Sequence, residues 1–239
     1  MASKSLIVDN KTFDISYEIV NAGCKKDIIF LHGWGSNKDI MKNVFSPFFK
    51  DFRHIYIDLP GFGKSSNEHA LKTEDYVKIT EEFLNLLNST KDIIVGHSYG
   101  GKVATSLNPK NLVLLSSAGI LEEKSFDVKA KIVLAKFFNT FGLGKITKMF
   151  RSSDVNTMNE GMYATFKNVV NEDFSNIFSN YKNNALIFWG EKDTATSLES
   201  GKKIASLITS STFVSYDGDH FFFTKNAKDI SERIENGIL

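Results

Sequence analysis

Short apolar runs that alternate with helical patterns constrain the fold of this chain more than any other feature of its sequence. The runs lie at Leu6–Val8, Ile28–Leu31, Ile55–Ile57, Ile93–Val95, Leu112–Leu115, Leu186–Trp189 and Thr212–Val214. Nearly continuous apolar runs of strand length are typical of strands that are buried on both faces of a parallel sheet. The clearest helical pattern follows Thr73, a candidate N-cap, and places Tyr76, Ile79, Phe83 and Leu86 on one face.

This alternation predicts βαβ units that are joined by right-handed crossovers. We therefore expect an α/β fold with a mostly parallel central sheet and helices on both of its faces. The segment from Phe13 to Val20 instead alternates apolar and polar residues, as a half-buried antiparallel strand does. A length of 239 residues suits one such domain with an inserted subdomain.

Composition and charge exclude several classes of function. Basic residues number 29 and acidic residues 28, so the net charge of +1 gives no reason to expect nucleic acid as a partner. The single Cys24 excludes an intramolecular disulfide, and the cysteine and histidines show no metal-ligand spacing. We therefore expect no metal and no organic cofactor. The sequence leaves the oligomeric state open.

Targeting and membrane signals do not stand out in the chain. The first residues, MASKSLIVDN, contain only a short apolar run, which is far from the apolar region of a signal peptide. No window approaches the roughly 18 to 20 apolar residues of a membrane-spanning helix. We expect a cytoplasmic protein without membrane insertion, and a single reduced cysteine agrees with that location.

The alternation of strands and helices stops between Leu121 and Asn184. This segment has no strand signal but is rich in aromatic residues, which are Phe126, Phe137, Phe138, Phe141, Phe150, Tyr163, Phe166, Phe174, Phe178 and Tyr181. Because it follows one sheet strand and precedes the next, we expect a helical cap (lid) over residues 121–184, inserted into a core of residues 1–120 and 185–239. Aromatic side chains turned towards the site would give an apolar pocket. In the simpler alternative, these side chains only pack the insertion against the core.

The strongest functional signal is the sequence GHSYG at residues 96–100, which follows the apolar run that ends at Val95. It matches G-x-S-x-G, a motif in which the serine lies on a tight turn between a strand and a helix. Glycines two positions before and after the serine remove side chains that would collide in this turn. The helix that follows points its free N–H groups towards developing negative charge. Ser98 is therefore the predicted nucleophile.

A serine nucleophile needs a base, and the base needs a carboxylate that orients it. His220 is the only histidine after Ser98, and it lies in a loop after the last apolar run, where this kind of site delivers its base. The acid is expected after the preceding apolar run, where Asp193 is the first candidate and Glu191 the second. The residues that directly follow Leu112–Leu115, an alternative place for the acid, include no carboxylate.

The oxyanion that forms during acyl transfer needs N–H donors. The backbone N–H of Tyr99, directly after the nucleophile, is the first expected donor. The second is expected in the loop HGWGS at residues 32–36, which follows a buried strand. The glycines of this loop let the backbone turn sharply, so the N–H of Trp34 can point into the site. We interpret His32 as a structural brace for the loop.

Together these motifs resemble those of the α/β-hydrolase superfamily along the whole chain. The motifs are HGWGS at residues 32–36, DLPGFGKS at Asp58–Ser65, GHSYGG at residues 96–101, WGEKDTAT at Trp189–Thr196 and GDH at Gly218–His220. The pairing of HGWG with DLPGFGKS is similar to small carboxylesterases of the pimeloyl-carrier-protein methyl esterase type. The resemblance implies the α/β-hydrolase fold, serine-hydrolase activity and a catalytic triad of Ser98, Asp193 and His220.

The sequence therefore predicts a serine hydrolase that cleaves carboxylic esters of small apolar substrates through an acyl-enzyme on Ser98. Two alternatives stay open. One is a C–C bond hydrolase that uses the same triad on vinylogous diketones of the meta-cleavage product type. Such enzymes usually carry Gly-Pro-Gly in the oxyanion loop, where this chain has Gly33-Trp34-Gly35. The other is a hydrolase-like protein that binds a small molecule without catalysis.

Overall fold

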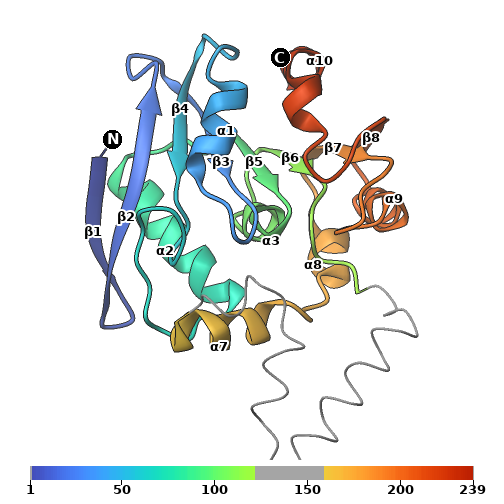
Figure 1. Ribbon diagram of the computed structural model, residues 1–239. Coiled ribbons are helices and arrows are strands. Elements are labelled where there is room, and N and C mark those ends of the chain that lie inside the picture. Colours follow the sequence, from blue (N-terminus) through green and yellow to red (C-terminus); the bar gives the residue numbers. More distant parts are fainter. Residues whose placement is uncertain (1, 122–158, 239) are drawn as a thin grey trace, which may run out of the picture.

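The computed structural model describes residues 2–121 and 159–238, whose arrangement Figure 1 shows. The strands are β1 (Ala2–Val8), β2 (Lys11–Val20), β3 (Lys26–Leu31), β4 (Phe52–Ile57), β5 (Ile93–His97), β6 (Asn111–Leu115), β7 (Asn184–Gly190) and β8 (Ser211–Tyr216). The helices in these ranges are α1 (Lys38–Phe45), α2 (Thr73–Leu86), α3 (Tyr99–Ser106), α7 (Glu160–Val169), α8 (Ser175–Asn180), α9 (Leu198–Leu207) and α10 (Phe223–Ile238).

All of these strands belong to one sheet, in the order β1-β2-β4-β3-β5-β6-β7-β8. Strands β3 to β8 run parallel to one another, whereas β2 is antiparallel to both β1 and β4. The β1–β2 hairpin closes through Asp9 and Asn10, whose φ angles of 48° and 60° fit a two-residue type I′ turn. The mostly parallel sheet and the antiparallel strand that begins near Phe13 are thus confirmed.

Helices cover both faces of the sheet, which explains why its parallel strands are apolar on both sides. In β3, Ile29 and Leu31 join the apolar cluster that includes buried residues of α2, α3 and α9. Ile28 and Phe30 point the other way, into a cluster with buried residues of α1 and α10. The predicted three-layer arrangement is therefore correct.

Helix α2 differs in detail from the predicted pattern. Its N-cap is Lys72, and Thr73 is the first helical residue. Leu86 is 46% exposed because it closes the last turn at the edge of the apolar stripe, beyond the packed part of the helix. Thr80 and Leu84 are buried instead, so the apolar face is shifted from the one that the sequence suggested.

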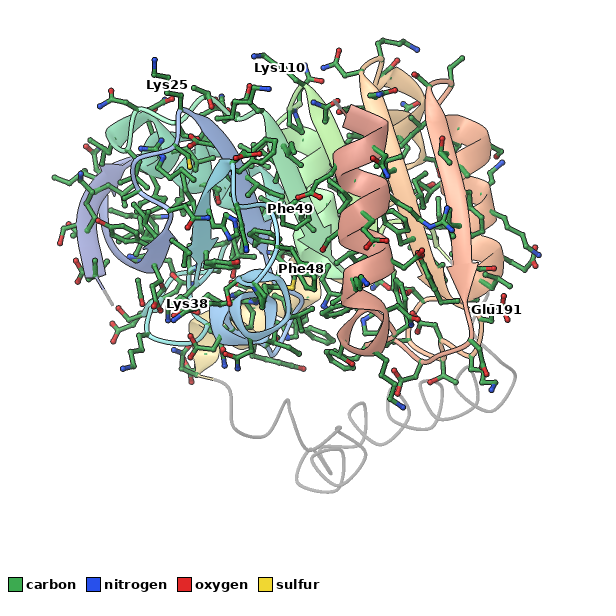
Figure 2. All side chains as sticks on the ribbon, turned by 90° about the horizontal axis from the view of Figure 1, so that it is seen from above. Lys25, Lys38, Phe48, Phe49, Lys110 and Glu191 are labelled. Carbon is green, nitrogen blue, oxygen red and sulfur yellow. The ribbon has the colours of Figure 1, made fainter. Side chains whose placement is uncertain are left out.

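The residues that follow parallel strands gather at one edge of the sheet. In Figure 2, Lys25 and Lys110, which precede β3 and β6, lie at one edge, and Lys38 and Glu191, which follow β3 and β7, lie towards the other. Ser98 directly follows β5 and so belongs to the second edge. The carboxyl edge of a parallel sheet is where ligands of α/β proteins bind.

Most of the predicted cap lies outside the described residues, including Phe126, Phe137, Phe138, Phe141 and Phe150. Its described part, residues 159–184, carries α7 and α8. There Phe174, Phe178 and Tyr181 are buried in the same apolar cluster as the sheet. These three rings therefore pack against the core. Among the described residues, no helix combines the length and the apolar character that crossing a membrane requires.

Candidate active site

Ser98 lies on a strained turn between β5 and α3. Its φ of 51° and ψ of −118° fall in a region that non-glycine residues rarely adopt. The turn is tightly enclosed: a Cβ atom on Gly96 would lie 2.5 Å from the backbone oxygen of Gly100. A Cβ atom on Gly100 would lie 2.5 Å from the backbone oxygen of Leu31. Both glycines of the motif are therefore required by close backbone contact, and the half-buried Ser98 faces a cavity.

The two predicted oxyanion donors lie beside this turn. A Cβ atom on Gly33 would lie 2.9 Å from the Ser98 Cβ atom, so the loop before Trp34 packs directly on the serine. Tyr99 begins α3, where backbone N–H groups have no partner within the helix. Within the described residues, the N–H groups of Trp34 and Tyr99 donate to no protein acceptor. Both amides are therefore available to a ligand oxygen.

His32 supports the loop through both ring nitrogens. Its Nε2 atom accepts a hydrogen bond from the backbone N–H of Leu59 at 3.0 Å, so Nδ1 carries the proton and donates to the carbonyl of Gly33 at 2.8 Å. Burial lowers the pKa of His32 to about 4, which keeps the ring neutral. The Gly33 carbonyl and the N–H of Trp34 belong to one trans peptide and point in opposite directions. By fixing the carbonyl, His32 also fixes the direction of that N–H.

The structure brings His220 and Asp193 together. The His220 Nδ1 atom lies 2.7 Å from the Asp193 Oδ2 atom. The Asp193 carboxylate also accepts hydrogen bonds from the backbone N–H groups of Ala195 and Thr196, at 2.8 and 3.0 Å. Burial disfavours its charged form, but the hydrogen bonds from His220, Thr196 and Ser116 outweigh this and lower the pKa of Asp193 to about 2. Asp193 is therefore an ionised partner for the imidazole.

The other carboxylates near His220 are engaged elsewhere. Glu191, the second candidate, accepts a hydrogen bond from Ser215 at 2.8 Å. Asp217 pairs with Lys192, and Asp219 accepts from the backbone N–H of Phe221 at 2.9 Å. Among the described residues, Asp193 is the carboxylate that contacts the His220 ring.

Ser98 and His220 make no direct hydrogen bond to each other in the described part of the chain. Such bonds are often long without a ligand and shorten only in the reacting complex. The two residues are linked through His97, which directly precedes Ser98. The rings of His97 and His220 lie 4.6 Å apart between centroids. No role was predicted for His97, although its place inside the GHSYG motif was a signal.

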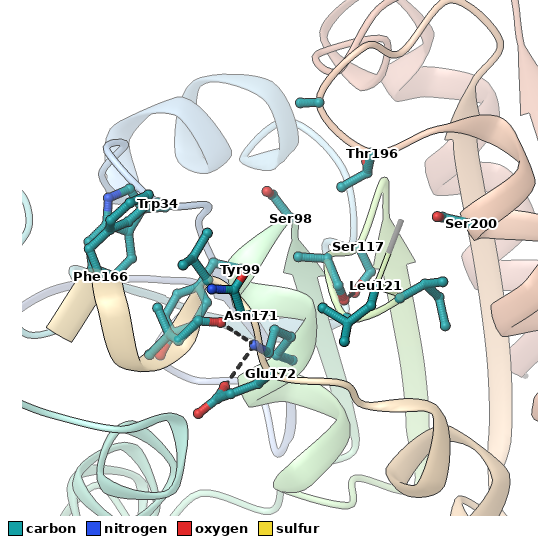
Figure 3. A pocket seen from close by; sticks show the side chains of 17 residues that line it. Trp34, Ser98, Tyr99, Ser117, Leu121, Phe166, Asn171, Glu172, Thr196 and Ser200 are labelled. Carbon is teal, nitrogen blue, oxygen red and sulfur yellow. Dashed lines mark hydrogen bonds and ion pairs between the residues drawn. The ribbon is translucent and has the colours of Figure 1, made fainter. Parts of the chain in front are cut away.

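The cavity at Ser98 has a volume of about 460 Å³ and is shown in Figure 3. Apolar side chains of Trp34, Ile120, Phe166 and Val170 form much of its wall. The rings of Trp34 and Phe166 lie 5.5 Å apart, so α7 meets the oxyanion loop at the cavity. The Trp34 ring therefore lines the pocket.

The cavity wall also contains a charged pair that was not predicted from the sequence. Lys102 and Glu172 both line the cavity, and the Lys102 Nζ atom lies 2.7 Å from the Glu172 Oε2 atom. Lys102 could have been noticed because it follows Ser98 by one helical turn. Its partner could not, since it lies 70 residues away in the chain.

No group of three or more His, Cys, Asp or Glu residues within the described ranges is arranged to hold a metal ion. The polar groups at the site include those of Ser98, His220, Asp193 and the two backbone amides, together with the Lys102–Glu172 pair. Acyl transfer by a serine requires a nucleophile, a carboxylate-oriented imidazole and N–H donors, and a serine hydroxyl, the His220–Asp193 pair and the two backbone amides lie here at one sheet edge.

Comparison with known proteins agrees with the observed fold. A family model described as "alpha/beta hydrolase fold" matches residues 27–143. A pimeloyl-[acyl-carrier protein] methyl ester esterase of Wigglesworthia glossinidia brevipalpis is 30% identical over 150 residues, which cover 54% of this chain and 56% of that protein. A putative esterase/lipase of Mycoplasma pneumoniae is 29% identical over 170 residues, which cover 67% of this chain and 62% of that protein. The chain thus spans less than two thirds of the length of these two relatives.

Solved structures of similar shape cover nearly the whole chain. An esterase from Exiguobacterium antarcticum has a TM-score of 0.74 at 19% sequence identity and covers 95% of this chain and 96% of its own. An enol-lactonase from Burkholderia xenovorans has a TM-score of 0.75 at 18% identity and covers 98% of both chains. At such low identity these structures show the shared fold alone.

Proposed function

We propose that this chain, which has the α/β-hydrolase fold, is a serine hydrolase that cleaves carboxylic esters through an acyl-enzyme on Ser98. The observation that carries the proposal is the 2.7 Å contact between His220 and Asp193, at the same sheet edge as a serine held on a strained turn. Curated relatives that carry the names of esterases support the same reaction class.

The reaction would proceed in two halves. Ser98 Oγ attacks the ester carbonyl carbon while the Nε2 atom of His220 takes the serine proton. The C–O bond to the alcohol then breaks, and the imidazolium returns the proton to the leaving oxygen. Water, deprotonated by the same imidazole, attacks the acyl-enzyme and releases the carboxylic acid and free Ser98. Both halves use the same base, so one histidine suffices.

Three other groups would lower the barrier without reacting. Asp193 holds the Nδ1–H tautomer of His220 and stabilises the imidazolium, which its lowered pKa allows. The N–H groups of Trp34 and Tyr99 donate to the negative oxygen of each tetrahedral intermediate. Loss of one such donor typically lowers kcat by about 10² to 10³.

The substrate would be a small ester with a substantial apolar part, since Trp34, Ile120 and Phe166 line the cavity. Residues 121–184 are proposed as a helical cap on a core of residues 1–120 and 185–239. The cytoplasm is the proposed location. C–C bond cleavage of a vinylogous diketone would use the same groups, so substrate trials must include it.

A fluorophosphonate probe and a panel of p-nitrophenyl esters test the proposal. The probe should label the wild-type chain on Ser98, and Ser98→Ala should lose labelling and at least about 10⁴-fold in ester turnover. Ser117→Ala is the matched control, because its hydroxyl lines the same cavity but donates to the carbonyl of Ala118 at 2.9 Å. Labelling should survive in that variant.

The esterase assignment would be overturned if the fluorophosphonate probe still labelled the Ser98→Ala variant. It would also be overturned if the wild type cleaved a vinylogous diketone in preference to every ester. Probe labelling without turnover of any substrate would favour the non-catalytic alternative.

A further inference from the structure

Lys102 places a positive charge in the wall of the cavity beside Ser98. It lies on α3, four residues after the serine, and this spacing corresponds to a rise of about 6 Å. Side chains of a helix lean towards its N-terminus, so Lys102 leans back towards Ser98. Its side chain is only 3% exposed. The cavity therefore has a buried ammonium group within a short distance of the proposed nucleophile.

The Lys102 ammonium has two protein acceptors within the described residues. It donates to the backbone carbonyl of Val169 at 2.8 Å and to Glu172 Oε2 at 2.7 Å, and it faces the ring of Phe174 at 4.5 Å. In Figure 3 a dashed line marks the interaction at Glu172. An ammonium carries three N–H donors, so one donor is available to a ligand. Burial lowers the pKa of Lys102, an effect that the hydrogen bond to Glu172 opposes.

Glu172 is held in place from the opposite side by Thr73. The Thr73 hydroxyl donates to Glu172 Oε2, and its backbone N–H lies 3.4 Å from Oε1. The Glu172 side chain is 26% exposed and also lines the cavity. An ionised carboxylate has about four acceptor positions, so it can still accept from a ligand. Together, Lys102 and Glu172 present a donor and an acceptor side by side.

Packing alone does not account for this pair. Removing two charges from water is unfavourable, and apolar residues of similar size are often as stable or more stable in such positions. Apolar side chains, among them Ile120, Phe166 and Val170, line the same cavity. The pair has no net charge, so an anionic ligand would be repelled by Glu172 and a cationic one by Lys102. A hydroxyl group, which both accepts and donates, matches the two partners.

We propose that Lys102 and Glu172 form a subsite that binds a hydroxyl group on the acyl part of an ester substrate. The inference rests on the proposed function, because it places the acyl group in the cavity beside Ser98. The acyl part is assigned rather than the alcohol because it takes part in both halves of the reaction and stays bound to Ser98 after the alcohol has left, until water releases it. Lys102 and Glu172 are thus specificity-determining residues.

Pairs of esters that differ in one group test the subsite. Methyl β-hydroxybutyrate is compared with methyl isovalerate, in which a methyl group replaces the hydroxyl. Methyl ω-hydroxyhexanoate is compared with methyl heptanoate in the same way, which places the hydroxyl further from the carbonyl. Acid release is titrated for each ester at constant pH. In at least one pair, the wild-type kcat/KM should be about tenfold or more higher for the hydroxy ester.

Variants then assign the preference to the charged pair. Lys102→Met should abolish or invert it, and the double variant Lys102→Met/Glu172→Gln, which leaves no unpaired charge, should do the same. Lys167→Met is the matched control, since this lysine is exposed on α7 and lies over the ring of Tyr163. Its hydroxyl preference should equal that of the wild type. Thermal unfolding shows whether each variant has folded. If Lys102→Met has not folded, the hydroxyl preference of the double variant tests the subsite in its place.

Each other outcome has a definite meaning. Equal or higher wild-type rates for the apolar partner of both pairs would overturn the subsite while leaving ester hydrolysis by Ser98 intact. A preference that persists in both Lys102 variants would overturn it as well. A hydroxyl preference only on the alcohol side, measured with glycol monobutyrate against propyl butyrate, would overturn the acyl assignment. Failure to cleave any of these esters would overturn the proposed function too.

Discussion

His97 donates a hydrogen bond from Nε2 to the backbone carbonyl of His220 at 3.0 Å, and so connects the proposed nucleophile to the proposed base. The residue directly before Ser98 thereby holds the loop that carries the imidazole. Burial lowers the pKa of His97 to about 3, so the ring stays neutral. Its Nδ1 atom is buried without a hydrogen-bond partner among the described residues. One buried ring therefore ties the loop of His220 to the turn of Ser98.

Replacement of His97 should disturb the position of His220 relative to Ser98 more than it disturbs binding of the ester. We expect His97→Phe to lower kcat by about 10- to 100-fold with little change in KM, since an ester can still enter the cavity. His97→Gln, whose side-chain amide reaches about as far as Nε2, should recover much of the loss. Steady-state kinetics on p-nitrophenyl butyrate measure both variants. Equal losses in the two would contradict the positioning role.

Two carboxylates near His220 should respond very differently to neutralisation. Asp193→Asn should lower kcat by about 10⁴, because the amide favours the wrong imidazole tautomer. Glu191→Gln is the matched control, since Glu191 contacts Ser215 and the solvent rather than the ring. Its kcat should stay within about twofold of the wild type. The reverse ranking, measured on the same ester, would move the acid to Glu191.

Acid should destabilise the fold through its buried histidines. In the unfolded chain His32 takes up a proton near the ordinary histidine pKa of 6.5, whereas burial holds the pKa in the folded protein at about 4. Below pH 6.5 the unfolded chain therefore binds more protons, and stability falls as the pH drops towards 4, by up to about 3 kcal/mol from this residue. Asp193 has a lowered pKa of about 2 in the folded protein and an ordinary value near 3.8 in the unfolded chain. Both states are therefore ionised above about pH 5, and its contribution to stability is lost only as the pH falls from about 5 towards 2.

Urea unfolding at pH 7 and pH 5 measures this effect. The wild type should lose stability on going to pH 5, and His32→Asn should be weaker at pH 7 but lose less between the two values. His69→Asn, at a half-exposed ring that contacts Phe13, is the control and should keep the wild-type loss. Identical losses in all three proteins would refute the assignment to His32.

The glycines of the nucleophile turn should tolerate no side chain. Gly100→Ala would bring a methyl group within 2.5 Å of the backbone oxygen of Leu31, so β3 and α3 must move apart. We expect a loss of several kcal/mol in stability, or failure to fold, together with loss of fluorophosphonate labelling. Gly23→Ala is the control, since no atom lies within 4 Å of the added carbon. Its stability should change by less than about 0.5 kcal/mol.

Local patterns in the sequence were sufficient for the sheet and for the turn at Ser98. Strands buried on both faces must be apolar throughout, so their positions can be recognised without knowledge of their neighbours. The turn at Ser98 needs Gly96 and Gly100 because backbone atoms approach those positions closely, and glycine is visible in any sequence. The chain order of Ser98, Asp193 and His220 follows from the order of the strands.

The tertiary structure decided what depends on contacts between distant segments. Asp193 rather than Glu191 meets His220 because the loops after β7 and β8 lie side by side at one sheet edge. Lys102 is buried against Glu172 because the segment between α7 and α8 packs on α3, although either residue alone would be expected at the surface. By itself, the sequence determined which elements form and which edge of the sheet holds the chemistry. Only the packing of those elements determined which charges meet, because the energy of a buried charge depends on partners that are far away in the chain.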